Sequence, residues 1–115
     1  MMPLSTKLQK VKKALTSIDG VRDKVSHYRR PPNLSGWIIW AEESDDGSLL
    51  YADNKLYEQI VTGKIEYWTK EEFDPVADAI QEALNADPAI GWRLSYVEYD
   101  ESSELIYHEW TFTVI

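Results

Sequence analysis

The fold is decided by one stretch of the chain, residues 55–68, which reads KLYEQIVTGKIEYW. Its side chains alternate between two faces over its whole length, whereas strands in globular domains typically have about 5–6 residues. In the second half, apolar residues such as Val61 and Ile65 alternate with polar ones such as Glu66. At roughly 3.3 Å per residue, a straight strand of this length would extend over about 46 Å. We therefore expect a bend or bulge at Gly63, or a strand end that projects from the body.

The length and composition of the chain indicate one globular domain. Its 115 residues suit a single domain, residues 1–115, with 43% hydrophobic and 28% charged residues. Acidic residues number 20 against 12 basic ones, a formal charge of -8. This charge repels phosphate backbones, and we expect neither tight nonspecific nor specific nucleic-acid binding.

Cysteine content and hydropathy bear on the cellular compartment. The chain has no cysteine, which removes disulfides, thiolate catalysis and cysteine metal sites and fits a reducing compartment. No run approaches the roughly 18 apolar residues of a membrane span. Lysines interrupt the N-terminal apolar residues where a signal peptide would have a continuous core. We therefore expect an intracellular protein that makes no membrane contact.

The clearest helix pattern is near the N-terminus. Its apolar stripe consists of Leu4, Leu8, Val11, Leu15 and Ile18. We expect Ser5 or a neighbour to cap this helix and Gly20 to end it. Its lysines are expected to face water; the alternative is that they bind an acidic partner.

A second helix is predicted after the long strand. Thr69 and Glu72 have the spacing of a capping box, and Asp74 before Pro75 offers a second start. The helix is expected to end near residues 85–88. Its apolar stripe consists of Phe73, Val76, Ala77, Ile80 and Leu84.

The remaining patterns predict strands. A short strand is expected at residues 24–28, stopped by two prolines, and another at residues 36–43, paired antiparallel with the long strand. Residues 92–99 and 105–115 form a second hairpin. The fold class is therefore α+β, with about five mainly antiparallel strands and two helices packed on one face. One core is expected between helices and sheet, formed by Leu8, Val11, Leu15, Ile65, Ile80, Leu84, Trp110 and Phe112.

The strand at residues 36–43 and the turn after it suggest an interface. Residues 37–40 read WIIW and are apolar on both faces, which suits a central strand covered by helices on one side and by a partner on the other. The acidic residues that follow, up to Gly47, are expected to form a solvated loop. The alternative is a metal site, although the spacing of a calcium loop does not follow.

No catalytic constellation is recognisable in the sequence. His108 lies between apolar residues of one strand face, which favours a hydrogen-bonded structural histidine over a base or ligand. His27 stands beside Tyr28, Arg29 and Arg30, as an ordinary strand-end cluster or as a basic corner that holds an acidic partner loop. We expect a protein that is not an enzyme and that binds no cofactor and no metal.

Several aromatic and acidic motifs, taken in order, resemble a known family. They are His27-Tyr28, Trp37-Ile38-Ile39-Trp40 with Glu42, Tyr51-Ala52-Asp53-Asn54, residues 68–75, Trp92-Arg93-Leu94 and Tyr107-His108-Glu109-Trp110. This set, within residues 20–115, resembles small prophage proteins from the tail-morphogenesis regions of long-tailed phages of Gram-positive bacteria. Such proteins are similar in size and topology to tail-terminator or tail-completion proteins, which form a ring that caps the tail tube and joins it to the head connector.

The resemblance implies a phage structural protein without catalytic residues. Its expected partners are further copies of itself in a ring and other tail or connector proteins. Its expected location is the virion, and the host cytoplasm during assembly. The alternative is a monomeric acidic protein-binding module or regulator. The expected interface residues are Trp37, Trp40, Glu42, Glu43, Asp45, Asp46, Leu56, Glu58, Ile60 and Thr62.

Overall fold

The computed structural model describes residues 2–43, 50–52 and 55–115. Two α-helices and seven strands are assigned in these residues, with a short 3-10 helix, η1, before the first strand. In chain order they are α1 (Leu4–Thr16), η1 (Arg22–Lys24), β1 (Val25–His27), β2 (Ile38–Glu42), β3 (Leu50–Ala52), β4 (Lys55–Glu58), β5 (Val61–Thr69), α2 (Pro75–Ala86), β6 (Ile90–Asp100) and β7 (Leu105–Val114). None of the described helices is long and apolar enough to cross a bilayer.

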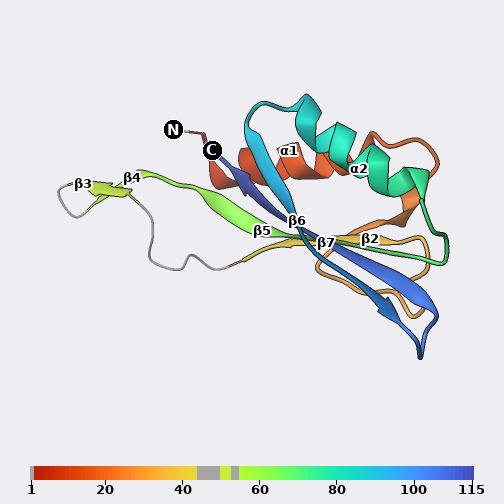
Figure 1. The fold of residues 1–115 in the computed structure, drawn as a ribbon. Helices are drawn as coiled ribbons and strands as arrows, with labels where there is room; N and C mark the ends of the chain where they lie inside the picture. Colours follow the sequence, from red (N-terminus) through yellow and green to blue (C-terminus); the bar gives the residue numbers. More distant parts are fainter. Residues whose placement is uncertain (1, 44–49, 53–54) are drawn as a thin grey trace.

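Five of the strands form one mixed sheet in the order β1-β2-β5-β7-β6. Neighbouring strands are antiparallel except β1 and β2, which are parallel. The helices α1 and α2 contact each other and lie on one face of this sheet (Figure 1). The predicted α+β fold with both helices on one face is therefore confirmed.

The long stretch at residues 55–68 forms two strands instead of one. It is interrupted at Gln59 and Ile60, so that β4 pairs with β3 in a separate hairpin and β5 enters the main sheet. The β3–β4 hairpin projects from the body (Figure 1), which confirms the expected projecting end. The antiparallel pairing expected between the strand at residues 36–43 and the long stretch is also confirmed, because β2 pairs antiparallel with β5 and Ile38 lies opposite Tyr67.

The other alternative, a bend or bulge at Gly63, is not observed, because the strand continues regularly through this residue. Gly63 pairs with Glu42 of β2 on one side and with Phe112 of β7 on the other. A Cβ atom on Gly63 would lie 2.3 Å from the carbonyl oxygen of Ala41 and 2.5 Å from the Phe112 ring. Glycine is therefore needed because the neighbouring backbone and ring approach closely.

One core lies between the helices and the sheet, as predicted. All eight expected core residues belong to it, with Leu8 partly buried at its edge and the other seven buried. Trp110 of β7 is the largest fully buried side chain, and its indole N–H donates a 3.0 Å hydrogen bond to Gln81 of α2. This bond satisfies the only polar group of the ring, as burial of a tryptophan requires.

The start of α1 differs from its prediction, whereas α2 begins at one of its two predicted starts. The helix α1 begins after Pro3 without a side-chain cap, so the expected cap at Ser5 is wrong, and it ends at Thr16, before Gly20. Asp74 caps α2 through a 2.8 Å bond from the Val76 N–H, which confirms the second predicted start. Phe73 consequently lies outside the helix and is 96% exposed, so its expected place on the apolar stripe is wrong.

One lysine of α1 does not face water. Lys7 is buried, because it lies four residues before Val11 and eight before Leu15 on the buried stripe of α1. Its ammonium donates to the backbone carbonyl of Gln59, at the interruption between β4 and β5. The other three lysines of α1 follow the expectation more closely, with Lys12 and Lys13 exposed and Lys10 near Asp87.

The strand β2 is buried on both faces within this chain. Ile38 and Trp40 face the helices, and Ile39, on the opposite face, is only 4% exposed. The loop after β1 borders Ile39, and its Arg30 makes a 2.6 Å ion pair with Glu66 of β5. The expectation that a partner must cover this second face is therefore wrong, because the chain covers it itself.

Truncation of core residues should test the helix placement. Leu15 and Ile80 are fully buried, so Leu15→Ala or Ile80→Ala should each lower the free energy of unfolding by about 2–5 kcal/mol. Urea unfolding measures this change. Leu4→Ala is the control, because Leu4 is 44% exposed and its truncation should cost far less. Equal losses at Leu4 and Leu15 would contradict the assigned buried face.

A methyl group at Gly63 should destabilise the sheet. In Gly63→Ala the new Cβ would overlap the Ala41 carbonyl oxygen, a backbone atom that cannot move without distorting β2. We expect a loss of about 1–3 kcal/mol in the free energy of unfolding. Thermal melting of Gly63→Ala and of wild type measures this effect. An unchanged melting temperature would contradict the close approach of the Ala41 carbonyl oxygen to Gly63.

Candidate functional site

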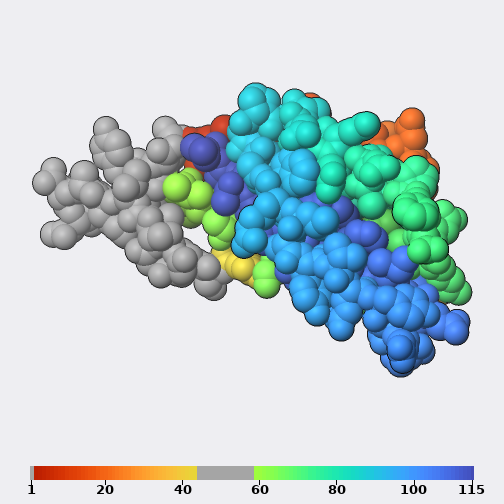
Figure 2. All heavy atoms as spheres, in the orientation of Figure 1, coloured from red at the N-terminus to blue at the C-terminus, as the bar shows by residue number. Residues whose placement is uncertain are grey.

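The strand β6 is an uncovered edge of the main sheet. It has 11 residues and pairs with β7 on one side, and within the described residues no strand pairs with its other side. Its atoms form a continuous strip on the near face of the molecule (Figure 2). The unpaired backbone groups of such an edge can bind another strand, and proteins usually protect them by short strands, prolines or charges.

The edge of β6 also exposes large apolar side chains. They are Leu94, Tyr96, Val97 and Tyr99, which are 46–56% exposed. Nearer the start of the strand Ile90 is buried and Trp92 half-buried, so the exposure is confined to the second half of β6. A contiguous apolar edge of this kind is typical of a protein–protein contact.

A bulge determines which side of the sheet each of these residues faces. The register with β7 shifts between Leu94 and Tyr96, and the hydroxyl of Ser95 donates to the backbone carbonyl of Glu109 at 3.1 Å. Leu94 and Val97 therefore lie on the helix side, whereas Tyr96 shares the opposite face with Glu109. The exposed edge thus presents apolar groups on both faces.

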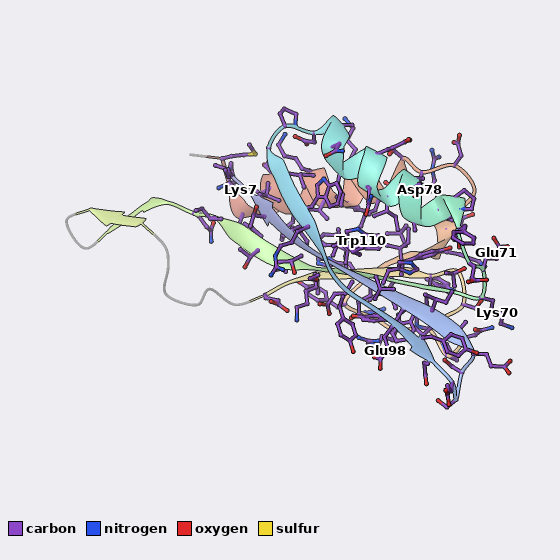
Figure 3. The ribbon with its side chains drawn as sticks, in the orientation of Figure 1. Lys7, Lys70, Glu71, Asp78, Glu98 and Trp110 are labelled. Carbon is purple, nitrogen blue, oxygen red and sulfur yellow. The ribbon has the colours of Figure 1, made fainter. Side chains whose placement is uncertain are left out.

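On the helix side, a groove of about 370 Å³ runs between α2 and the β6–β7 hairpin. Its floor includes His108 and Trp110, whose rings stack at 5.7 Å. Leu94, Val97 and Phe73 line it and are exposed. Figure 3 shows Trp110 between the sheet and α2. The groove therefore extends the apolar surface of the β6 edge towards the start of α2.

A hydrogen-bonded carboxylate holds the end of this groove in place. The Oδ2 atom of Asp74 accepts 2.6 Å bonds from the hydroxyls of Tyr67 and Thr69, and Oδ1 accepts the bond from the Val76 N–H. Burial by itself would raise the pKa of Asp74, but the bonds from Thr69, Tyr67 and Val76 outweigh it and hold the pKa below its usual value. Phe73, the preceding residue, has a left-handed φ of 54°.

His108 belongs to the floor of the groove. Its ring lies 6.1 Å from that of Tyr67, and burial lowers its pKa. Its Nδ1 is buried without a hydrogen-bond partner in the described part of the chain. In residues 2–43 and 59–115, histidine and acidic side chains form no group of three placed to hold a metal ion. The structure thus adds ring contacts with Tyr67 and Trp110 to the sequence interpretation of His108.

The opposite face of the sheet carries a second hollow, of about 400 Å³. Its aromatic wall is formed by Trp68 and Tyr107, with ring centroids 4.4 Å apart. Its acidic rim contains Glu98, Asp100 and Glu101 at the end of β6. Figure 3 places Glu98 on the side of the sheet away from α2. Aromatic faces beside carboxylates suit a cationic side chain of a partner.

The expected basic corner lies at the other edge of the sheet. His27 of β1 stacks on Trp40 at 3.8 Å, and its Nε2 lies 2.7 Å from Oε1 of Glu42. Burial would raise the pKa of Glu42, but hydrogen bonds from Tyr28 and His27 hold it below its usual value. Tyr28 has a left-handed φ of 71° and is 58% exposed. The exposed cations around β1 are Arg22, Lys24, Arg29 and Arg30.

The described side chains among the residues expected at an interface differ in their exposure. Trp40 is 2% exposed and contacts Phe112 edge-on in the core, so its expected place at an interface is wrong. Trp37, Ile60 and Thr62 are half-buried. Glu42 is engaged with β1, and Glu43 is exposed and pairs with Lys64 at 3.5 Å. Asp45 and Asp46 lie outside the described residues, as do the side chains of Leu56 and Glu58.

The sequence interpretation missed the β6 edge and Phe73. It assigned residues 92–99 to a strand, but not to the edge of the sheet, because strand order is not encoded in local alternation. The sequence did contain one signal. Tyr96 and Val97 are adjacent apolar residues, and adjacent residues of a regular strand face opposite sides of the sheet, so apolar groups were to be expected on both sides here. Phe73 was assigned to the apolar stripe of the helix because Thr69 and Asp74 were both possible helix starts, and a helix that begins at Thr69 includes Phe73.

The charge of Asp74 should make stability depend on pH. Its folded pKa is lowered, so its stabilisation is fully present above the unfolded pKa of about 4 and is lost as the pH falls through the folded value. Asp74→Asn should lower the free energy of unfolding near neutral pH by about 1–3 kcal/mol. Urea unfolding over a range of pH should show that this difference shrinks in acid; a constant difference would contradict the assignment.

Comparisons with known proteins do not identify a family. No protein-family model matches the chain, and no curated protein matches it. The functional assignment therefore depends on the exposed edge and its surroundings, and on the resemblance seen in the sequence.

Proposed function

We propose that this chain is a phage structural protein of the tail-terminator or tail-completion type, which acts by self-association into a ring. In this role it would dock on the tail tube or the head connector, in the virion and, during assembly, in the host cytoplasm. The observation that carries the proposal is the uncovered β6 edge with its four exposed apolar side chains. An edge of this kind would promote aggregation unless a partner covers it.

A standard interface would cover only a small share of the protomer's surface. The chain has 7503 Å² of accessible surface, and a standard interface takes roughly 800 Å² from each partner, or about a tenth of it. The second half of β6, the groove beside α2 and Phe73 form a continuous surface from which such an interface can be built.

The shape of the protomer also supports an assembly role. A ring component between two other structures needs surfaces for ring neighbours and separate surfaces for what lies above or below. The β3–β4 hairpin projects away from the body, whereas β6 borders the opposite side of the main sheet from β1 (Figure 1). The protomer thus has a projecting hairpin and a separate sheet edge for two kinds of partner.

A monomeric acidic binding module is the second candidate. The aromatic and acidic hollow at Trp68, Tyr107 and Glu98 favours it, because a basic segment of another protein would fit there. The two candidates differ in oligomeric state: a module that binds a foreign segment remains monomeric by itself, whereas a ring component associates with its own copies.

A lysine on the β6 edge should prevent self-association. Leu94→Lys places a charge among the apolar side chains that a neighbour would cover, so sedimentation velocity should show a smaller species than wild type, and tails should fail to complete in a phage that depends on this protein. Leu4→Lys is the matched control, because Leu4 is 44% exposed and Leu94 46% exposed. Wild-type protein that remains monomeric up to millimolar concentration would contradict the proposed function.

A further inference from the structure

The two edges of the main sheet carry opposite charges. The end of β6 and the turn after it are acidic, with Glu98, Asp100, Glu101 and Glu104. The residues around β1 are basic, with Arg22, Lys24, Arg29 and Arg30, all exposed, against the single acid Asp23 in the range 22–30. Because the strand order is β1-β2-β5-β7-β6, these surfaces lie at opposite edges of one sheet.

The β1 edge is able to receive a strand, but only weakly by its backbone. Within the described residues β1 pairs with β2 alone, so its other side has no strand partner. It has only three residues, and Pro31 and Pro32 follow its end. A ladder formed along β1 would therefore contain few hydrogen bonds, and charge and side-chain contacts must supply the remaining affinity.

The geometry points to a head-to-tail contact, which rests on the proposed self-association. We propose that the β6 edge of one copy docks beside the β1 edge of a second copy, so that the sheet continues from one protomer to the next. Glu98 and Glu101 then face Lys24 and Arg29 of the neighbour. Tyr28, which is 58% exposed beside β1, supplies apolar area opposite the exposed residues of β6.

The β1 edge is a better binding site than α1 for the acidic β6 edge of another copy. The cations of α1 include Lys7, which is buried on Gln59, and Lys10, which lies 3.5 Å from Asp87. Lys12 and Lys13 are exposed, but a helix has no free backbone groups along its side that could pair with a strand edge. At β1, Arg30 is held by Glu66 and Arg22 donates to the Thr16 carbonyl, whereas Arg29 and Lys24 are exposed and make no ion pair in the described residues.

Such a contact can repeat from copy to copy, because it joins two different surfaces and each bound copy keeps one of them free for a further copy. Each copy would use its β6 edge towards one neighbour and its β1 edge towards the other, and a repeated heterologous contact forms a ring when its rotation closes. Since charge supplies part of the affinity, association should weaken with salt, as the Debye length falls from about 10 Å at 0.1 M to about 3 Å at 1 M.

A charge-swap experiment tests the pairing directly. One variant combines Glu98→Lys with Glu101→Lys; the other combines Lys24→Glu with Arg29→Glu. Each variant alone sets like charges against each other and should associate at least about tenfold more weakly than wild type in sedimentation velocity. A mixture of the two variants restores opposite charges at both contacts of an alternating ring and should return association to the wild-type level.

Matched controls carry the same charge changes elsewhere. Lys12→Glu with Lys13→Glu on α1, and Asp19→Lys with Glu82→Lys beside the two helices, alter exposed residues outside both edges and should leave association unchanged. Thermal melting of every variant verifies that it is folded.

The outcomes separate this inference from the proposed function. If wild type associates but the mixture does not, or if the α1 variant is the one that loses association, copies meet through other surfaces: the inference is wrong and the proposed function stands. If wild type itself stays monomeric, both are wrong. Recovery in the mixture alone, with unchanged controls, supports the head-to-tail pairing.

Discussion

The packing of Trp110 against α2 is the interaction on which the arrangement of the fold depends. Trp110 is almost completely buried, and its N–H donates to Gln81, so α2 is held over β7 by both apolar contact and a directed bond. Because α1 packs beside α2 and over β5, the helix layer covers the centre of the sheet. Two helices cannot also cover the far end of β6, and Leu94, Val97 and Tyr99 remain exposed there. The exposed edge is thus a consequence of where the helix layer ends.

The same layer explains the buried lysine of α1. Lys7 lies on the buried stripe, and its long apolar stem can pack against the core while the ammonium reaches a polar group. That group is the carbonyl of Gln59, where the long alternating stretch leaves the main sheet to form the β3–β4 hairpin. A cation on the helix is thereby connected to the point at which the hairpin departs from the body.

The net charge of -8 conceals an uneven surface. Cations gather on α1 and around β1, whereas acids gather at the end of β6 and before α2. A uniformly acidic surface would repel its own copies, but opposite charges at the two edges of one sheet favour a defined orientation of the copies and disfavour others. An uneven distribution therefore permits association in a protein whose overall charge opposes it.

Local patterns in the sequence determined the two helices, the five strands of the main sheet and the core residues. They also determined the antiparallel pairing of residues 38–42 with residues 63–67. Helical and strand periodicities are properties of neighbouring residues, so the sequence alone records them. Tertiary structure alone decided that β6 is the edge, that Trp40 is buried, that the β1 loop covers Ile39 and that Gly63 marks a close approach. Strand order and coverage depend on contacts between residues far apart in the chain. No local pattern records those contacts, and the candidate site arises from them.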